Sequence, residues 1–429
     1  MNRSPLLVSL ILVVVLVLGA SIAGAQEEIT LRVLTHWGEE IVLPGQLAMI
    51  EAYEAANPGV KIELETVPFN DLLTKIITGQ TAGTNPDIFH LYNLWLPEFT
   101  RSGLLAVPPQ EVVDAIVANT SPGIVEGVSA GGQVWGWPTE VNTYLLIYNK
   151  RLLEEAGYSE PPQNWEELRE MAAAMTVTDD TGAITQAGFA VWPGWDSGIV
   201  HPFASLLMSN GGRYLTEDLS ATAFNSPEGL ETLQLYADLL ADGSLDISVP
   251  SGEFVNGRVG MTIMANWWRA TLRAAEAIDY DTEVGVAPIP VGPSGSETAT
   301  MSYNWLWSVA STSEHPEVAW DFIQWMNTPP AEGEPSPMGD YLVHSLGAIP
   351  SMIYDQEAFS EELGDHFLAP FVASTAYAVP EPIAAGGQEV KTKLQAEIEA
   401  VLSGMQDPAS ALEFAAMEGD AVLAEYAAQ

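Results

Sequence analysis

The chain has 429 residues, 47% of them apolar, and this size predicts two domains with sizeable cores rather than a disordered chain. Its 57 acidic and 14 basic side chains give a net charge of −43, which disfavours binding to nucleic acid or to an anionic membrane surface. The chain has no cysteine, which excludes a disulfide scaffold, a thiolate zinc site and a cysteine nucleophile.

The first 25 residues have the pattern of a secretory signal peptide. Arg3 precedes an apolar run over residues 6–18, and Ala23-Gly24-Ala25 has the small side chains of a cleavage site. The run is short for a membrane span, although an uncleaved anchor is the alternative interpretation. No cysteine follows that could carry a lipid. We therefore expect secretion across the cytoplasmic membrane, to the periplasm or the outer face of the cell envelope, without a lipid anchor.

The segment after the signal pattern alternates strands and helices. Short apolar or alternating runs predict strands, and longer segments before turn residues such as Asn57-Pro58-Gly59 predict helices. In chain order, the expected elements are a strand at 29–34, a helix at 45–56, a strand at 60–67, a helix at 70–81 and a strand at 88–91. This order is typical of a parallel sheet covered by helices.

Helix-capping residues predict several further helices. Asn164 precedes a helix at 165–175, with Glu167 as its capping-box partner. Ser226 is placed to cap a helix that ends at a glycine. Ser313 is expected to cap a later, amphipathic helix. Residues 394–428 predict two more helices.

A series of short segments then occurs in a recognisable order. The segments are 69–72, 83–88, 102–105, 136–138, 146–150, 161–168, 254–261, 288–290, 315–322 and 347–350. Together they resemble the family 1 extracellular solute-binding proteins, the maltose-binding-protein-like group. The resemblance runs from about residue 29 to the C-terminus. One departure is Tyr303-Asn304, which stands where the family often has a Gly-Gly pair, so this part of the pocket is expected to differ.

The resemblance implies an α/β protein with the two-lobed periplasmic-binding-protein fold. Each lobe would hold a mainly parallel sheet flanked by helices, and crossing hinge segments would join the lobes. We expect the first lobe to contain residues 26–139 plus about 284–335, and the second 140–283 plus about 336–429.

The resemblance also implies the function. The protein would capture a carbohydrate, an oligosaccharide or a monosaccharide, in the cleft between the lobes. It would close around the ligand and deliver it to the membrane permease subunits of an ABC importer. We expect a monomer that is not an enzyme and needs no cofactor or metal. The alternatives are a secreted carbohydrate hydrolase, a signalling receptor subunit, or a binding protein for a polyol, a glycerol-phosphate ester or a peptide.

The candidate ligand-binding residues combine aromatic rings with polar groups, because a sugar has flat apolar faces and a rim of hydroxyls. They lie in clusters at 36–39, 92–95, 192–196, 266–269 and 303–305 and on the crossing segment near residue 140. The candidates are Trp37, Glu39, Tyr92, Asn93, Glu140, Asn142, Trp195, Asp196, Trp267, Trp268, Arg269, Tyr303, Asn304 and Trp305. A tryptophan is often a core residue, so only some of these are expected to contact ligand. By the resemblance, Trp267 aligns with a tryptophan that stacks on sugar.

Catalytic patterns are weak. The six histidines are scattered, without the spacing of a metal site, and no phosphate-binding loop or nucleophile elbow occurs. A glycosidase would need two carboxylates flanking the scissile bond, but among 57 acidic residues such a pair will arise by chance.

Overall fold

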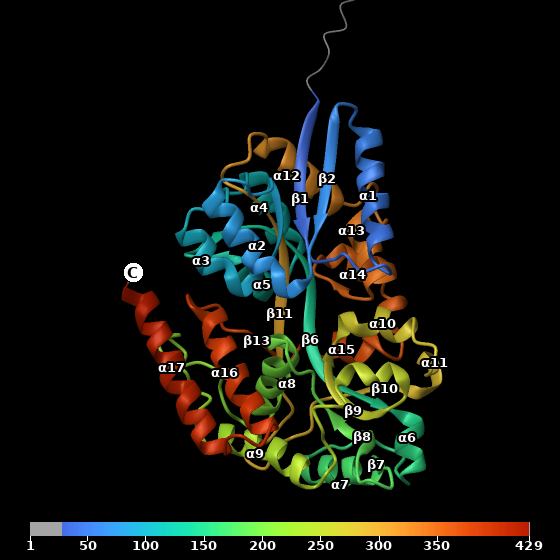
Figure 1. The fold of residues 1–429 in the computed structure, drawn as a ribbon. Coiled ribbons are helices and arrows are strands. Elements are labelled where there is room, and N and C mark those ends of the chain that lie inside the picture. The colour runs from blue at the N-terminus through green and yellow to red at the C-terminus, as the bar shows by residue number, and fades with distance from the viewer. Residues whose placement is uncertain (1–27, 429) are drawn as a thin grey trace, which may run out of the picture.

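The computed structural model describes residues 28–428, so the predicted signal peptide lies outside the described residues. One curled, mixed sheet runs through the molecule in the strand order β2-β1-β3-β11-β6-β9-β8-β7 (Figure 1). Its strands are β1 (Ile29–Thr35), β2 (Val60–Thr66), β3 (Ile88–Tyr92), β6 (Trp137–Asn149), β7 (Val177–Thr178), β8 (Ile184–Ala190), β9 (Val259–Ala265), β10 (Val284–Ala287), β11 (Thr300–Val309), β12 (Ile349–Pro350) and β13 (Ala378–Pro380). A separate hairpin joins β4 (Ser129–Ala130) to β5 (Gln133–Val134).

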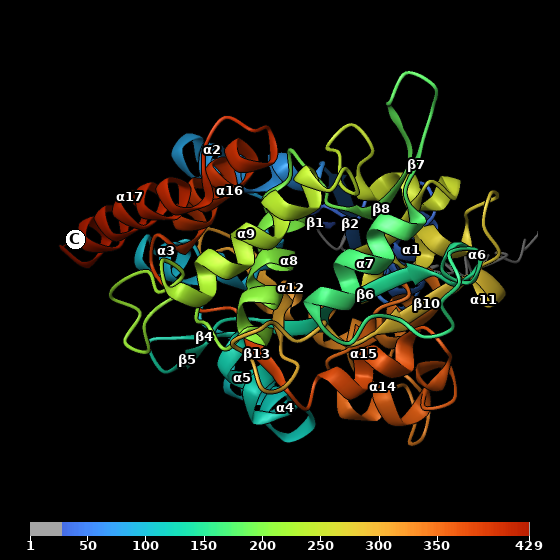
Figure 2. The ribbon, with the colours of Figure 1, turned by 90° about the horizontal axis from the view of Figure 1, so that it is seen from below.

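Helices cover this sheet on both sides. They are α1 (Leu43–Ala56), α2 (Phe69–Ala82), α3 (Leu96–Arg101), α4 (Gln110–Asn119), α5 (Pro122–Gly127), α6 (Lys150–Glu155), α7 (Trp165–Met175), α8 (Asp196–Ser209), α9 (Pro227–Ala241), α10 (Arg269–Arg273), α11 (Tyr280–Glu283), α12 (Pro316–Met326), α13 (Pro337–Asp340), α14 (Ile353–Ala358), α15 (Leu368–Ser374), α16 (Gly387–Leu402) and α17 (Pro408–Ala428). The 3₁₀ turns η1 (Asn93–Trp95) and η3 (Asn266–Trp268) follow β3 and β9. Seen from below, α16 and α17 pack side by side along one edge (Figure 2).

The molecule has the two-lobed α/β fold. The first lobe holds β1, β2 and β3, and the second holds β8, β9 and β10 (Figure 1). The expected parallel pairing occurs between β1 and each of β2 and β3, and between β8 and β9. The long strands β6 and β11 run from one lobe into the other and pair antiparallel with each other, with β9 and with β3, whereas β11 and β13 pair parallel.

The boundaries between the lobes remain a proposal, which the packing now refines. β10 pairs with the second-lobe end of β6, at Leu146–Asn149, although residues from 284 onward were expected in the first lobe. α13 packs against α12 and α14, although residues from 336 onward were expected in the second lobe. We therefore propose that the chain crosses between the lobes in β6, in β11 and in the segment after α14.

The local elements follow the sequence patterns closely, with one exception. The Asn164 side chain accepts a hydrogen bond from the Glu167 N–H at 2.9 Å, and Ser226 accepts one from the Gly229 N–H at 3.2 Å. The prediction of a Ser313 cap is wrong. α12 begins at Pro316, so His315 and not Ser313 occupies the position before the helix, and the Ser313 hydroxyl donates to Asp87 instead.

Across residues 28–428, no helix combines the length and the apolar character needed to cross a membrane. The core is continuous from β1 through β6 and β11 to β9, and its largest fully buried side chains include Trp137, Tyr144 and Trp268.

Candidate ligand-binding cleft

A cavity of about 530 Å³ lies where strands of the two lobes end facing one another. Its walls are built by the segments that follow the carboxyl ends of β1, β3, β8 and β9 and by the start of α2. In α/β proteins, side chains gather at this edge of the sheet because the backbone turns outward there and leaves a crevice. Each aromatic cluster follows a strand and precedes a helix in the sequence, and the clusters therefore meet in one cavity.

The first-lobe wall is a stack of aromatic rings. His36 lies 4.1 Å from Trp305 between ring centroids, with the planes tilted by only 28°. Trp37 packs beside it against His90. Burial lowers the pKa of His36 to about 3, so the imidazole is neutral at physiological pH. Phe69, at the start of α2, meets Trp305 nearly edge-on.

The second-lobe wall consists of three tryptophans set at steep angles. Trp192 and Trp195 lie in the loop before α8, with ring centroids 5.7 Å apart and planes at 86°. Trp267, in η3, lies 5.7 Å from Trp195 at 64°. Trp195 also meets Phe69 of the first lobe at 6.1 Å and 78°, so the aromatic surface is continuous across the two lobes.

The floor of the cavity comes from the crossing strands β6 and β11. Glu140 of β6 is 2% exposed and accepts a hydrogen bond from the Thr139 hydroxyl. Burial raises the pKa of this carboxyl to about 7. Tyr303 of β11 accepts a hydrogen bond from the Trp267 indole N–H at 2.9 Å, which links the floor to the second-lobe wall.

A buried ionic cluster lies directly behind the cavity, formed by Lys391, Glu381 and His201. The Lys391 ammonium donates to the hydroxyl of Tyr92 at 3.0 Å and to that of Ser197 at 2.9 Å. Tyr92 and Ser197 both line the cavity, one from each lobe. The same ammonium lies 3.5 Å from Glu381, which also contacts His201 at 3.0 Å. The cluster therefore holds cleft residues of both lobes.

Most of the predicted ligand-binding residues line this one cavity. They are Trp37, Glu39, Tyr92, Glu140, Trp195, Trp267, Trp268, Tyr303 and Trp305. Trp268 is only 1% exposed and packs against Phe254, so it belongs mainly to the core. Whether each side chain contacts a ligand stays a prediction.

The remaining predicted residues, Asn93, Asn142, Asp196, Arg269 and Asn304, do not line the cavity. Arg269 is turned away because its guanidinium pairs with Asp365 and donates to Tyr280. Asn304 lies between Tyr303 and Trp305 on β11, and alternate strand residues point to opposite faces. Its amide donates to the Glu140 carbonyl.

The other three also lie outside the residues that line the cavity. Asp196 accepts a hydrogen bond from Gln388 of α16 at 2.7 Å. Asn93 and Asn142 are buried, with 3% and 0% of their surface exposed. The sequence shows that these polar residues adjoin aromatic ones, but it does not show which side of the strand end each one takes.

The sequence analysis missed several lining residues, among them Phe69, Asn70, Ser197 and Thr271. Phe69 and Asn70 could have been predicted from the sequence, since they follow the strand at 60–67 just as the aromatic clusters follow other strands. Ser197 carried no signal, because its role depends on Lys391, which is distant in the sequence.

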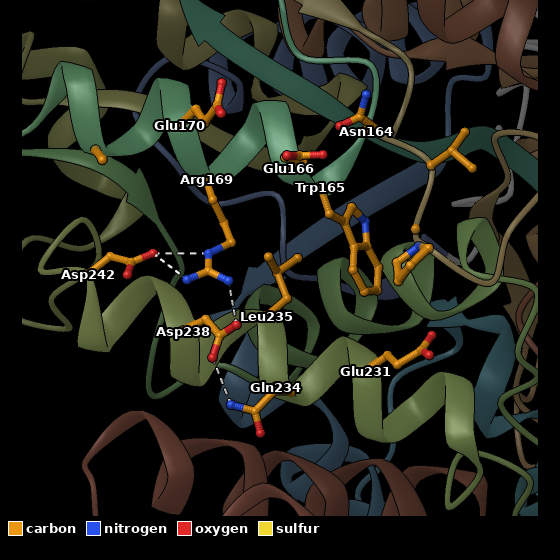
Figure 3. A pocket seen from close by; sticks show the side chains of 14 residues that line it. Asn164, Trp165, Glu166, Arg169, Glu170, Glu231, Gln234, Leu235, Asp238 and Asp242 are labelled. Carbon is orange, nitrogen blue, oxygen red and sulfur yellow. Dashed lines mark hydrogen bonds and ion pairs between the residues drawn. The ribbon is translucent and has the colours of Figure 1, made fainter.

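A second and larger hollow, of about 890 Å³, lies between α7 and α9 on the second lobe (Figure 3). Arg169 of α7 reaches across it to Asp238 at 2.6 Å and to Asp242 at 2.8 Å. Trp165, at its side, is 7% exposed and donates to the Pro290 carbonyl. This groove is walled by one lobe, so a ligand there would not bridge the two lobes.

Comparisons with known proteins agree with this fold. The family model described as bacterial extracellular solute-binding protein matches residues 46–333. A binding protein of Brucella abortus is 26% identical over 87% of this chain and 88% of its own length. Two solved structures are similar over 92% of this chain. The cyclic alpha-maltosyl-1,6-maltose binding protein from Arthrobacter globiformis has a TM-score of 0.71 and 28% identity over 99% of its chain. An ABC transporter solute-binding protein from Thermotoga lettingae, bound with alpha-D-tagatose, has a TM-score of 0.81 and 23% identity over its whole chain (100%). The expected resemblance is thus confirmed, and the chain belongs to the family of bacterial extracellular solute-binding proteins.

Proposed function

We propose that this protein captures a carbohydrate in the cleft between its lobes and delivers it to the permease subunits of an ABC importer. The observation that carries the proposal is the single cavity walled by aromatic rings from both lobes, joined where Phe69 meets Trp195. Flat rings of this kind pack against the apolar faces of pyranose or furanose rings, while Glu39, Asn70 and Tyr303 offer polar atoms to hydroxyls. Of the two similar solved structures, one is bound with alpha-D-tagatose and the other is a cyclic alpha-maltosyl-1,6-maltose binding protein.

Binding would act through a shift between open and closed arrangements of the lobes. A ligand stabilises the closed arrangement only by the contacts that it makes to both lobes at once. The tryptophans before α8 and in η3 belong to one lobe, and His36, Trp37 and Phe69 belong to the other. A sugar ring between these walls has this bridging effect, and the closed, loaded form is the species that a permease would receive.

The charges of the side chains that line the cleft distinguish an uncharged sugar from the anionic ligands among the alternatives. A glycerol-phosphate ester or a peptide carboxylate requires a cationic partner. Among the described residues that line the cleft there is no lysine or arginine, whereas two glutamates, Glu39 and Glu140, are present. A polyol has no ring face to pack against the tryptophans. These points favour a sugar.

The hydrolase alternative has little support. The family is one of solute-binding proteins. A glycosidase reaction would use two carboxyls on opposite sides of the scissile bond, and Glu39 and Glu140 both line the cleft, so the carboxyls alone do not separate the two functions and a direct assay is needed. Incubation with oligosaccharides separates the possibilities, since the hydrolase predicts released products and our proposal predicts binding without turnover.

A thermal-shift screen over mono- and oligosaccharides tests the proposal. A ligand at 100 times its dissociation constant adds about 2.7 kcal/mol to the unfolding free energy of a protein that binds it only in the folded state. We expect at least one sugar to raise the melting temperature in this way. A complete absence of shifts across the screen would reject carbohydrate binding.

We also propose that the mature protein works outside the cytoplasmic membrane, in the periplasm or on the outer face of the envelope. The family is extracellular, and residues 1–25 have the signal pattern described above. Fractionation of cells that express the full chain, with N-terminal sequencing of the secreted form, tests this proposal. An unprocessed N-terminus in the cytoplasm would contradict it.

A further inference from the structure

The charged side chains that line the cleft are all acidic. The titratable side chains that line it are Glu39, Glu140, His36, Tyr92 and Tyr303. Burial keeps His36 neutral and the tyrosines protonated, so among the described lining residues only the two glutamate carboxyls can carry a charge, and that charge is negative. The whole chain adds to this field with its net charge of −43, which attracts cations and repels anions.

The nearest cations of the described chain are not free to enter the cleft. The Arg269 guanidinium is paired with Asp365 and donates to the Val343 carbonyl. The Lys391 ammonium lies behind the cleft, where it is 0% exposed and bonded to Tyr92, Ser197 and His201. A positive group on a ligand would therefore meet no facing positive charge.

The three tryptophans of the second-lobe wall and Phe69 are set at steep angles to their neighbours instead of lying parallel, and all of them line the cavity. Trp195 stands near a right angle to Trp192, at 86°, and is steeply inclined to Trp267, at 64°. Phe69 closes the corner from the other lobe, at 78° to Trp195. The face of an aromatic ring carries partial negative charge, and several faces around one point attract an ammonium group.

Glu140 is a buried carboxyl that has no cationic partner within the described chain. It accepts a hydrogen bond from Thr139, and its surroundings contain no ammonium or guanidinium within the described chain. Isolation of this kind disfavours the ionised carboxylate, which is why burial raises its pKa to about 7. A cation brought by the ligand would restore the ionised form.

We infer that the preferred ligand is a sugar that carries a protonated amino group, held between the second-lobe tryptophans (Trp192, Trp195 and Trp267) and the Glu140 carboxylate. The inference rests on the proposed carbohydrate binding and narrows it to amine-bearing sugars. The ammonium N–H groups donate hydrogen bonds to the carboxylate, while the sugar ring packs against the neighbouring indoles. Glu39, at the mouth of the cleft, adds attraction as the ligand approaches.

Matched sugars test this inference by titration calorimetry at pH 7. Glucosamine, galactosamine, mannosamine and the glucosamine dimer are compared with glucose, galactose, mannose and cellobiose, which carry a hydroxyl in place of each amine. N-acetylglucosamine keeps the nitrogen but lacks the charge. We expect at least one amine-bearing sugar to bind about tenfold or more tightly than its uncharged counterparts.

Two further measurements tie the preference to the named groups. Glu140→Gln keeps the shape of the side chain and should weaken binding of the amine-bearing sugar about tenfold, with less than about threefold change for the neutral counterpart. Glu63→Gln is the matched control, because it removes one charge from an exposed position on β2. For the wild-type protein, raising the pH until the ligand amine loses its proton should abolish the preference, and this measurement does not depend on the folding of a variant.

The outcomes are distinct. If neutral sugars bind as well as or better than the amine-bearing sugars, the inference is wrong while carbohydrate binding stands. A preference for the amine that Glu140→Gln leaves unchanged also overturns it. If no sugar of either kind binds, both the inference and the proposed function fail.

Discussion

Two buried carboxyls on either side of the cleft floor have opposite electrostatic surroundings. Glu140 faces the cavity and is 2% exposed, and Glu381 lies in the ionic cluster behind it and is 3% exposed. Burial raises the pKa of Glu140 to about 7. Burial also acts to raise that of Glu381, but Lys391 and His201 hold it at about 2.

The difference shows that burial alone does not decide the state of a carboxyl; its partners do. Glu381 is fully paired by the protein, and its cluster fixes Tyr92 and Ser197, one from each lobe. Glu140 accepts a hydrogen bond from the Thr139 hydroxyl, has no ammonium or guanidinium partner within the described chain, and lines the cavity. The Glu381 cluster therefore supports the structure, whereas recognition of a ligand by Glu140 is the proposal made above.

The largest expected effect comes from removing the cation behind the cleft. Lys391→Met keeps the length of the side chain but leaves Glu381 buried without its ammonium partner. Breaking a buried pair in this way should lower the unfolding free energy by about 3–5 kcal/mol, measured by chemical denaturation at pH 7. A loss below about 1 kcal/mol would contradict the structural role of the cluster.

The two carboxyls should change the unfolding free energy in opposite directions as the pH rises. The folded-state pKa of Glu140 lies above its ordinary value of 4.5, so its contribution is complete below pH 4.5 and is lost as the pH rises through about 7. The pKa of Glu381 lies below 4.5, so its contribution is present above pH 4.5 and is lost as the pH falls through about 2. Each shift converts to roughly 3 kcal/mol.

Denaturation of the ligand-free wild type, Glu140→Gln and Glu381→Gln across this pH range checks the prediction. Glu140→Gln should reduce the decline toward neutral pH, and Glu381→Gln should reduce the decline toward acid. Parallel curves for the two variants would mean that their environments are alike.

Removal of a cleft tryptophan should affect ligand binding rather than folding. Trp267 is half-buried, faces the cavity and donates to Tyr303. With a sugar that shifts the wild type, Trp267→Ala should remove most of the roughly 2.7 kcal/mol of ligand-induced stabilisation, with little change in the melting of the free protein. Trp325→Ala, at a half-buried tryptophan on α12, is the control and should keep the full shift. An unchanged shift for Trp267→Ala would remove this residue from the site.

The smallest effect is expected at the surface of α16, the helix that also carries Lys391. Lys393 pairs with Glu418 at 3.3 Å, and both side chains are more than one third exposed. Lys393→Met should therefore lower the unfolding free energy by less than about 1 kcal/mol. A loss comparable to that of Lys391→Met would show that position on α16, rather than burial of the charge, controls the result.

Much of the local structure could be predicted from the sequence. The strand predicted at 60–67 is β2 (Val60–Thr66), the helix predicted at 70–81 is α2 (Phe69–Ala82), and the Asn164 and Ser226 caps are confirmed. These features depend on residues within a few positions of one another, so periodicity and capping chemistry are sufficient to find them. The site could be predicted only as a set of aromatic clusters after strands.

What the sequence by itself determined is therefore the α/β alternation, the caps and the position of the aromatic clusters at strand ends. Only the tertiary structure decided which neighbour in each cluster faces the cleft, turning Arg269 toward Asp365 and burying Asn304 behind Tyr303. It also brought Tyr92 to Glu381, 289 positions away in the chain. Contacts across such separations depend on how β6 and β11 join the two lobes, and no local pattern of side chains records that pairing.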